Sequence, residues 1–360
     1  FNSEFRNIVY FLSFKESTYI EKTMVSTYFI NNKINDKLYV SNYHGFSRSI
    51  LQKHGYLMNN NLQNINIFRS VDDSRIEDNV GYGLEQIEAK ILSDFNLYVK
   101  NSNGDKVNEK TEEYNSIVIS KLLPQNIIPY NAILTLTIKL LRDNVNILNF
   151  YKKYYVSILV DEFQDTTEAQ YDLFKSCFIG SKSHFTAVGD DKQRIMLWAG
   201  AQHSIFDDFI MDTNAVRIPL VMNFRCAPRL VTLLNYLTEN LLGKTDSAIP
   251  SSKWKPDQGD CSIWVFDNPT DEMHELFNEV LKWVTVDGIN PREICILVKQ
   301  QLSQYAGNLI EYFNQNGLRT RDENKFQDIL TDDLSIFIVN MLYIIFDKRN
   351  HNARGESFSF

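Results

Sequence analysis

Two short apolar runs that each end in polar residues stand out in the hydrophobic pattern of the chain. The run at 158–160 ends in Asp161 and Glu162, and the run at 185–188 is followed by Gly-Asp-Asp-Lys-Gln at 189–193. Continuous apolar runs of this length are typical of strands buried on both faces of a parallel sheet. Because an open α/β sheet binds ligands at the carboxyl ends of its strands, the pattern predicts a nucleotide site at these residues.

The rest of the pattern predicts an α/β fold. Further apolar segments with the length of strands lie at residues 8–13, 38–40, 262–266 and 294–298. Segments with apolar residues at helical spacing lie at 46–54, 132–154, 229–241, 270–284 and 302–316. Between residues 55 and 125 the chain is polar and rich in asparagine, which predicts a mostly helical insertion. Strands that alternate with helices indicate a parallel sheet covered by helices on both faces.

Composition narrows the class of protein. The chain has 360 residues and no apolar run that approaches the roughly 18 residues of a membrane span, so we expect no membrane partner. Its net charge of −8 argues against a protein that coats nucleic acid through bulk charge, but not against one that grips a short single strand. The four cysteines form no CxxC pair, so we expect them to be buried and reduced, as in a cytoplasmic protein.

The acidic pair Asp161-Glu162 has two interpretations. An isolated Asp-Glu at the end of a strand is ordinarily two solvated acids. In the functional interpretation, one carboxylate holds Mg²⁺ and its neighbour orients or deprotonates an attacking water. The second polar loop at 189–193, which also follows an apolar strand, favours the functional interpretation.

These segments make the chain resemble the UvrD/Rep/PcrA type of superfamily 1 DNA helicase. The sequence DEFQDT at 161–166 is similar to motif II of that family, and residues 188–201 are similar to motif III. Weaker matches occur in the family's order at 8–18 for motif Ia, 41–46 for motif Ib and 223–225 for motif IV. The resemblance implies an incomplete first RecA-like domain at 1–55 and 130–214, a mostly helical insertion at 56–129, and part of a second RecA-like domain at 215–360.

The resemblance also assigns roles in ATP hydrolysis. Asp161 would hold Mg²⁺, Glu162 would position and activate the attacking water, and Gln193 would contact the γ-phosphate of ATP. Arg225, similar to the motif IV arginine, would reach the γ-phosphate from the second domain, where its planar charged group would stabilise developing charge. The ordinary alternatives are a surface glutamine and a surface salt bridge. Two further residues are expected to bind the cofactor, Gln164 and Asp165.

Four aromatic residues are candidates for contact with single-stranded DNA. Trp198 is similar to an aromatic that stacks on bases in the family, although a core tryptophan is the alternative interpretation. Phe14 in the motif Ia loop, with Tyr43 and His44 in motif Ib, would add further contacts. Stacking of a base on an aromatic ring contributes roughly 1–3 kcal/mol.

Some family motifs have no match in the chain. The first phosphate loop, GxxxxGK[ST], should precede the motif Ia strand, and motifs V and VI should follow motif IV. The one Gly-Lys-Thr, at 243–245, has Thr238 where the first glycine belongs and follows a helical segment, so we interpret Gly243 as a helix C-terminal glycine. We therefore expect a fragment of a helicase that is inactive alone.

Two functional hypotheses follow for the intact protein. The first is an ATP hydrolase and DNA helicase, in a bacterial cytoplasm, that moves on single-stranded DNA with the family's 3′-to-5′ polarity and opens junctions of single- and double-stranded DNA. The second is a helicase-like, DNA-sensing regulatory subunit that controls a nuclease partner in anti-phage defence. An α/β domain that has lost catalysis is disfavoured because Asp161, Glu162, Gln193 and Arg225 are all present.

Overall fold

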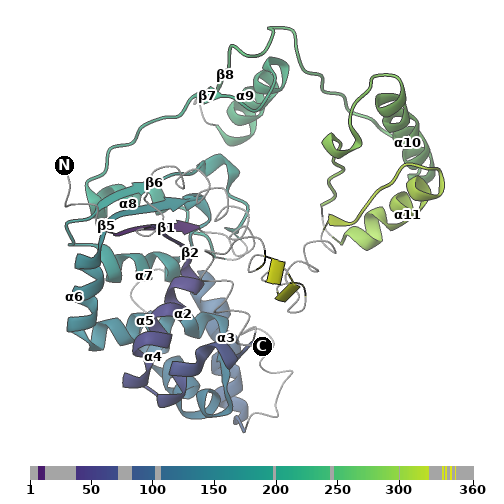
Figure 1. The fold of residues 1–360 in the computed structure, drawn as a ribbon. Helices are drawn as coiled ribbons and strands as arrows, with labels where there is room; N and C mark the ends of the chain where they lie inside the picture. Colours follow the sequence, from purple (N-terminus) through teal and green to yellow (C-terminus); the bar gives the residue numbers. More distant parts are fainter. Residues whose placement is uncertain are drawn as a thin grey trace. The chain divides into compact units, whose positions relative to one another are not determined.

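The computed structural model divides the chain into two compact units, Phe1–Gly259 and Asp260–Phe360 (Figure 1). The structure describes residues 7–12, 38–71, 83–101, 107–197, 200–243, 247–299 and 301–323, together with 335, 337, 338, 341, 342 and 345.

A four-stranded parallel sheet organises the first unit. Its strands, in the order in which they pair, are β2 (Leu38–Asn42), β1 (Asn7–Leu12), β5 (Tyr155–Asp161) and β6 (His184–Ala187). Every pairing is parallel, with Val9 opposite Ile158 and Val160 opposite Ala187. The predicted α/β class and its parallel sheet are confirmed, and all carboxyl ends of these strands meet at one edge.

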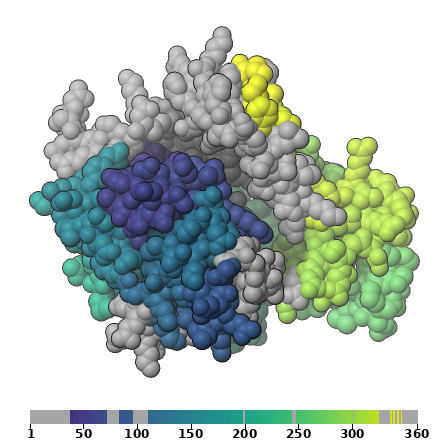
Figure 2. All heavy atoms as spheres, turned by 90° about the horizontal axis from the view of Figure 1, so that it is seen from below, coloured from purple at the N-terminus to yellow at the C-terminus, as the bar shows by residue number. Residues whose placement is uncertain are grey.

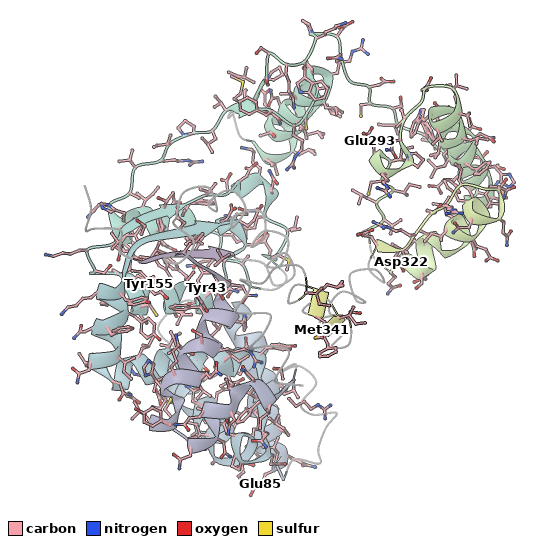
Figure 3. The ribbon with its side chains drawn as sticks, viewed as in Figure 1. Tyr43, Glu85, Tyr155, Glu293, Asp322 and Met341 are labelled. Atoms are coloured by element: carbon pink, nitrogen blue, oxygen red, sulfur yellow. The ribbon has the colours of Figure 1, made fainter. Side chains whose placement is uncertain are left out.

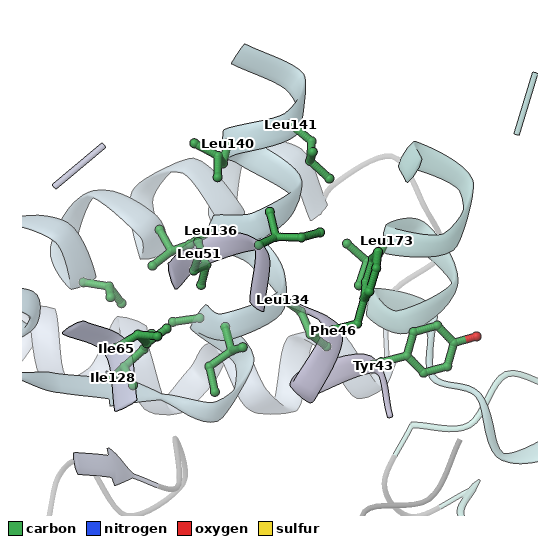
Figure 4. Packing of buried hydrophobic residues seen from close by; sticks show 14 of the residues in the cluster. Tyr43, Phe46, Leu51, Ile65, Ile128, Leu134, Leu136, Leu140, Leu141 and Leu173 are labelled. Carbon is green, nitrogen blue, oxygen red and sulfur yellow. The ribbon is translucent and has the colours of Figure 1, made fainter. Parts of the chain in front are cut away.

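Four helices form the core beside this sheet: α2 (Tyr43–His54), α5 (Tyr130–Asp143), α6 (Val145–Tyr154) and α7 (Glu168–Phe178). They occupy one side of the sheet in Figure 1, and their interlocking side chains, among them Phe46, Leu136 and Leu173, are seen in Figure 4. On α2 the residues at 43, 46, 47, 50 and 51 are buried, which is the spacing of a single helix face.

The single helix predicted at 132–154 is two helices that meet at Asn144. The Asn144 side chain donates to the carbonyl oxygen of Leu140 at 2.8 Å, and its own carbonyl accepts the N–H groups of Ile147 and Leu148. The residue thus ends α5 and begins α6. An asparagine side chain competes for backbone groups in this way, and apolar periodicity does not reveal it.

The polar stretch that follows α2 is mainly helical. Its larger helices are α3 (Gln86–Asn101) and α4 (Val107–Ile117), and its short turns are η2 (Gly55–Leu57), η3 (Asn60–Ile67), η7 (Val118–Leu122) and η8 (Leu123–Gln125). It also contains a small parallel sheet of β3 (Arg69–Val71) and β4 (Ile127–Pro129), which the sequence pattern did not predict because three-residue strands are too short to alternate. In Figure 2 its blue atoms adjoin the purple surface of the segment that contains α2.

The first unit continues through α8 (Ile205–Thr213), the strand pair β7 (Met222–Asn223) and β8 (Ile249–Pro250), and α9 (Pro228–Leu242). Gly243 ends α9 in the left-handed conformation, with φ of 62°, and its N–H donates to Glu239. The interpretation of Gly243 as a helix C-terminal glycine is confirmed. Lys244 and Thr245 lie outside the described residues.

The second unit is described mainly through α10 (Pro269–Thr285), η12 (Pro291–Glu293) and α11 (Leu302–Gln315), whose buried core is Phe277, Val280 and Phe313. The helices predicted at 270–284 and 302–316 are confirmed. The strands predicted at 262–266 and 294–298 are wrong, because neither segment pairs with a strand in the described part of the chain. Cys177 is buried as expected, but Cys226 is only partly buried, and Cys261 and Cys295 are exposed. Among the described residues no helix has the length and apolar character needed to cross a bilayer.

Candidate nucleotide site

The carboxyl ends of β5 and β6 bring two polar loops together. Asp161 is the last residue of β5, opposite Leu12 of β1. Beyond the last paired residues, the N–H of Val188 donates to Val160 at 2.8 Å and the N–H of Phe163 donates to Val188 at 2.9 Å. These bonds keep the segments 161–166 and 188–193 side by side, so the two motifs quoted from the sequence lie next to each other at one edge of the sheet.

Glu162 turns the chain sharply as it leaves the strand. It has φ of 48° and ψ of 39°, a left-handed conformation that is uncommon outside glycine, and its N–H donates to Asp161 Oδ1 at 2.9 Å. The next side chain, Phe163, is fully buried against the rings of Phe206 and Phe209. The turn therefore leaves the Glu162 carboxylate exposed beside an aromatic anchor. Local strain of this kind tends to be retained where it serves a site.

Gln164 is buried behind the acidic pair, with 1% of its surface exposed. Its Nε2 donates to Glu162 Oε2 at 2.8 Å, and its Oε1 accepts the N–H of Asp190 at 3.1 Å. A Cβ atom added to Gly189 would lie 2.3 Å from Gln164 Oε1, so the glycine is required for this close approach. Gln164, predicted to bind the cofactor, here joins the two loops.

Asp190, which was not among the residues predicted from the sequence, organises the second loop. Its Oδ1 accepts the N–H of Lys192 at 3.0 Å and lies 3.3 Å from Lys192 Nζ, while its Oδ2 accepts Gln193 Nε2 at 2.9 Å. The turn η10 (Asp191–Gln193) follows directly, and Gln193 is exposed. The run of two aspartates after Gly189 is the sequence feature that could have identified this residue.

Asp165 binds the segment that follows the second loop, at Met196. Its carboxylate is buried, and Oδ1 accepts the N–H of Met196 at 3.3 Å. Arg194 donates through Nε to the Gln164 carbonyl oxygen at 3.3 Å and through a terminal nitrogen to the His203 carbonyl oxygen at 3.1 Å. Asp165 and Arg194 thus fasten residues 194–203 to the segment that follows β5.

The acidic pair fits a divalent cation with oxygen ligands. Mg²⁺ in proteins is usually held by one or two carboxylates, with phosphate oxygens and water completing an octahedral shell. Asp161 supplies one such carboxylate at the sheet edge, and Glu162 follows it directly. No group of three or more acidic, histidine or cysteine side chains with metal-ligand geometry gathers in the described ranges.

The aromatic candidates for DNA contact differ in placement. Tyr43 lies where α2 leaves the sheet (Figure 3), and its side chain is 1% exposed. Burial raises the pKa of its hydroxyl, an effect that a side-chain hydrogen bond with Thr166 reduces. The ring offers no free face to a base, so the predicted DNA contact at Tyr43 does not fit. His44 is partly exposed and packs edge-on against Tyr130. Phe14 and Trp198 lie outside the described residues.

Arg225 is exposed in the turn that follows β7. Its N–H donates to Asn223 Oδ1 at 2.9 Å, and the N–H of Cys226 donates to the same oxygen at 2.8 Å. No salt bridge within the described part of the chain involves its guanidinium, so the surface ion pair considered from sequence has no support there. The Arg225 side chain is thus an exposed cationic group in the turn after β7.

Comparison with known proteins shows that part of the chain matches a protein family. The family described as "UvrD/REP helicase N-terminal domain" matches residues 15–214. The ATP-dependent DNA helicase Rep of Escherichia coli is 34% identical over 116 residues, which are 32% of this chain and 17% of Rep. A probable DNA helicase II homolog of Mycoplasma capricolum is 35% identical over 120 residues, 33% of this chain and 16% of the relative. DNA helicase II of Escherichia coli is 32% identical over 141 residues, 38% of this chain and 19% of the relative. The matched segment is less than a fifth of each of these relatives.

Proposed function

The chain belongs to the UvrD/REP helicase family, and we propose that it carries part of the ATP-hydrolysing site of an ATP-dependent DNA helicase or translocase. The observation that supports this most directly is the hydrogen-bonded edge of the parallel sheet. There Asp161, Glu162 and Gln193 come from two loops that follow neighbouring strands. A ligand site at the carboxyl edge of such a sheet is the general arrangement in open α/β proteins.

The proposed roles follow from the side chains. Asp161 would hold Mg²⁺, which when bound neutralises charge on the phosphate oxygens. Glu162, exposed and fixed by the turn, would orient the attacking water and accept its proton. Gln193 would donate an amide hydrogen to a γ-phosphate oxygen of ATP. Arg225 would supply a second, permanently charged donor to the same phosphate.

The domain arrangement is part of the proposal. Residues 1–55 and 130–214 would form a first RecA-like domain, 56–129 a mostly helical insertion, and 215–360 part of a second RecA-like domain. ATP would bind where the two domains meet. Gln164 and Asp165 would support the nucleotide site through the loop contacts described above.

Single-stranded DNA is the proposed track. Stacking of bases on aromatic rings and a few phosphate contacts would hold the strand, which suits a chain with a net charge of −8. Trp198, Phe14 and His44 are the proposed contacts, whereas the burial of Tyr43 removes it from this set. We propose movement with 3′-to-5′ polarity and opening of junctions between single- and double-stranded DNA.

Substitution of the proposed base tests the assignment. In the full-length protein that carries this chain, Glu162→Gln should lower the DNA-stimulated rate of ATP hydrolysis by roughly 100-fold or more, since general-base catalysis contributes at least that much. Binding of a fluorescent ATP analogue should persist. The matched control is Glu168→Gln, which changes a carboxylate in the first turn of α7 and should leave the rate within about twofold.

The same preparation separates a motor from a sensor. Wild-type protein that hydrolyses ATP should displace one strand of a partial duplex with a 3′ single-stranded tail. Unchanged hydrolysis in Glu162→Gln contradicts the proposed site. Hydrolysis without strand displacement instead supports a DNA-sensing regulatory subunit with a nuclease partner.

A further inference from the structure

An unbroken chain of hydrogen bonds connects Glu162 to Gln193. Gln164 Nε2 donates to Glu162 Oε2 at 2.8 Å, and Gln164 Oε1 accepts the N–H of Asp190 at 3.1 Å. At the far end, Asp190 Oδ2 accepts Gln193 Nε2 at 2.9 Å. The carboxylate proposed to activate water and the amide proposed to contact the γ-phosphate are therefore linked through one buried glutamine and one aspartate.

The chemistry of the partners fixes the orientation of the Gln164 amide. A carboxylate can only accept, so the nitrogen of Gln164 must face Glu162. A backbone N–H can only donate, so the oxygen of Gln164 must face Asp190. Reversing the amide would oppose two acceptors at one end and two donors at the other. Each link in the chain thus has a single direction.

Packing leaves Gln164 little room to move. Its side chain is buried, and its main-chain carbonyl oxygen accepts Arg194 Nε at 3.3 Å. Phe163 beside it is anchored among aromatic rings. Gly189 lies directly against the amide oxygen, where any Cβ would collide. A displacement of Asp190 therefore strains its hydrogen bond to Gln164 Oε1, and the confined amide passes that strain to the hydrogen bond that holds Glu162.

We propose that Gln164 is a positioning residue that couples the loop 190–193 to the carboxylate of Glu162. The inference rests on the proposed ATPase function. In the arrangement seen here, Gln193 is held by Asp190. When Gln193 turns to a γ-phosphate oxygen, Asp190 loses that donor and shifts with its loop, and its N–H carries the shift through Gln164 to Glu162. Glu162 is thereby aligned in response to the nucleotide that Gln193 contacts.

A purely structural role for Gln164 makes a different prediction from a positioning role. A buried amide that only fills the core would lower stability when replaced and would leave the catalytic step of the folded protein unchanged. A positioning residue would lower kcat at full saturation with ATP while KM and nucleotide binding stay near their wild-type values, because it acts on Glu162 rather than on the substrate.

Gln164→Leu is the first test, in the full-length protein with single-stranded DNA present. We expect kcat for ATP hydrolysis to fall roughly 10- to 100-fold, as for other residues that orient a reacting group from behind, with KM within about twofold. Gln170→Leu is the matched control. Gln170 is also buried, but its side chain accepts the N–H of Thr167 at 3.0 Å in a helix cap, so its loss should reduce stability without changing kcat.

A double-mutant cycle tests the coupling itself. Asp190→Ala breaks the link to Gln193 without touching Glu162, and should lower kcat. If both residues act through one relay, Gln164→Leu combined with Asp190→Ala should be no slower than the worse single variant. Multiplicative effects in the cycle overturn the proposal.

A second variant keeps the proposal testable if Gln164→Leu does not fold, and Glu162→Gln separates failure of the relay from failure of the ATPase site. Should Gln164→Leu fail to fold, as judged by circular dichroism, Gly189→Ala replaces it, because its Cβ would lie 2.3 Å from Gln164 Oε1 and must displace the amide. The same loss of kcat is expected. Wild-type kcat in either folded variant, alongside a Glu162→Gln variant that is inactive, overturns the relay alone. If Glu162→Gln also keeps wild-type kcat, the proposed ATPase site fails and the relay fails with it.

Discussion

Similar apolar segments form a buried strand in the first unit and an exposed, irregular segment in the second. In the first unit, the run that contains Ile158 and Val160 is the inner strand β5, paired with β1 and β6, and both side chains are buried. In the second unit, the segment 262–266 has the same apolar character but no strand partner among the described residues, and Ile263 and Val265 are 91% and 87% exposed. A strand-like sequence becomes a strand only where neighbours satisfy its backbone groups.

This difference determines where a site can form. Asp161 and Glu162 occupy defined positions because β5 is fixed on both sides and Phe163 is packed among aromatic rings. The unpaired segments of the second unit give their polar neighbours no such support. The chemistry proposed for the chain is therefore concentrated in the first unit. Measurements of the free energy of unfolding of both units can test whether the first is more tightly packed than the second.

The largest expected effect is the loss of Phe46 from the first unit. This side chain is fully buried and, among the described residues, meets the aromatic rings of Tyr39, Tyr151, Tyr155 and Phe178. Phe46→Ala should lower the free energy of unfolding by roughly 5 kcal/mol, near the top of the range for buried phenylalanine. Urea denaturation followed by circular dichroism measures it. Tyr236→Ala, at an exposed ring on α9, should change the same quantity by less than about 0.5 kcal/mol.

A smaller loss is expected from the equivalent substitution in the second unit. Phe313 is 2% exposed, but the described core around it contains only two other buried side chains, Phe277 and Val280. A small core can collapse into the space left behind, so Phe313→Ala should cost roughly 3 kcal/mol. The loss should appear in the unfolding of the second unit, and Tyr305→Ala, exposed on the same helix, should leave it unchanged. A loss equal to that of Phe46→Ala would contradict the contrast.

The sheet and the acidic pair could be predicted from the sequence because both depend on short, local patterns. The runs that became β5 and β6 carry their own apolar content, and the polar loops follow them directly. The bond between Gln164 and Asp190 could not be predicted, since it joins residues 26 apart in the chain and depends on the register of β5 with β6. The predictions of strands at 262–266 and 294–298 were wrong because an apolar pattern within one segment does not reveal whether another strand will pair with it.

The burial of Tyr43 was within reach of the sequence. A helix that begins at residue 46 leaves Tyr43 in a loop, where a ring can meet DNA. A helix that begins at Tyr43, as α2 does, puts this residue on the face shared with Phe46 and Ile50. The Asn42 side chain, which accepts the N–H of Gly45 at 2.7 Å, was the feature that marked the earlier start.

Loss of a helix cap should lower the free energy of unfolding of the two units by the same amount. An equal effect of the caps would show that the units differ in their cores and not in their helix ends. Thr167 begins α7 with a capping box shared with Gln170, and the Asn268 side chain accepts the N–H groups of Thr270 and Asp271 at the start of α10. Because a cap acts locally, Thr167→Ala and Asn268→Ala should each lower the free energy of unfolding of their unit by about 1 kcal/mol. Thermal denaturation can resolve this. A cost confined to Thr167→Ala would mean that α10 adds nothing to the stability of its unit.

The smallest expected effect bears most directly on the unpaired segments. In this chain Ile263→Ser should change the free energy of unfolding by no more than about 0.5 kcal/mol, because the side chain is almost fully exposed and buries little apolar surface. The same change at Ile158, buried in β5, should cost several times more, since it removes apolar contacts and buries a hydroxyl group. Urea titration of both variants gives the comparison. Equal losses at the two positions would mean that the segment 262–266 pairs as a strand in solution, and the contrast between the units would disappear.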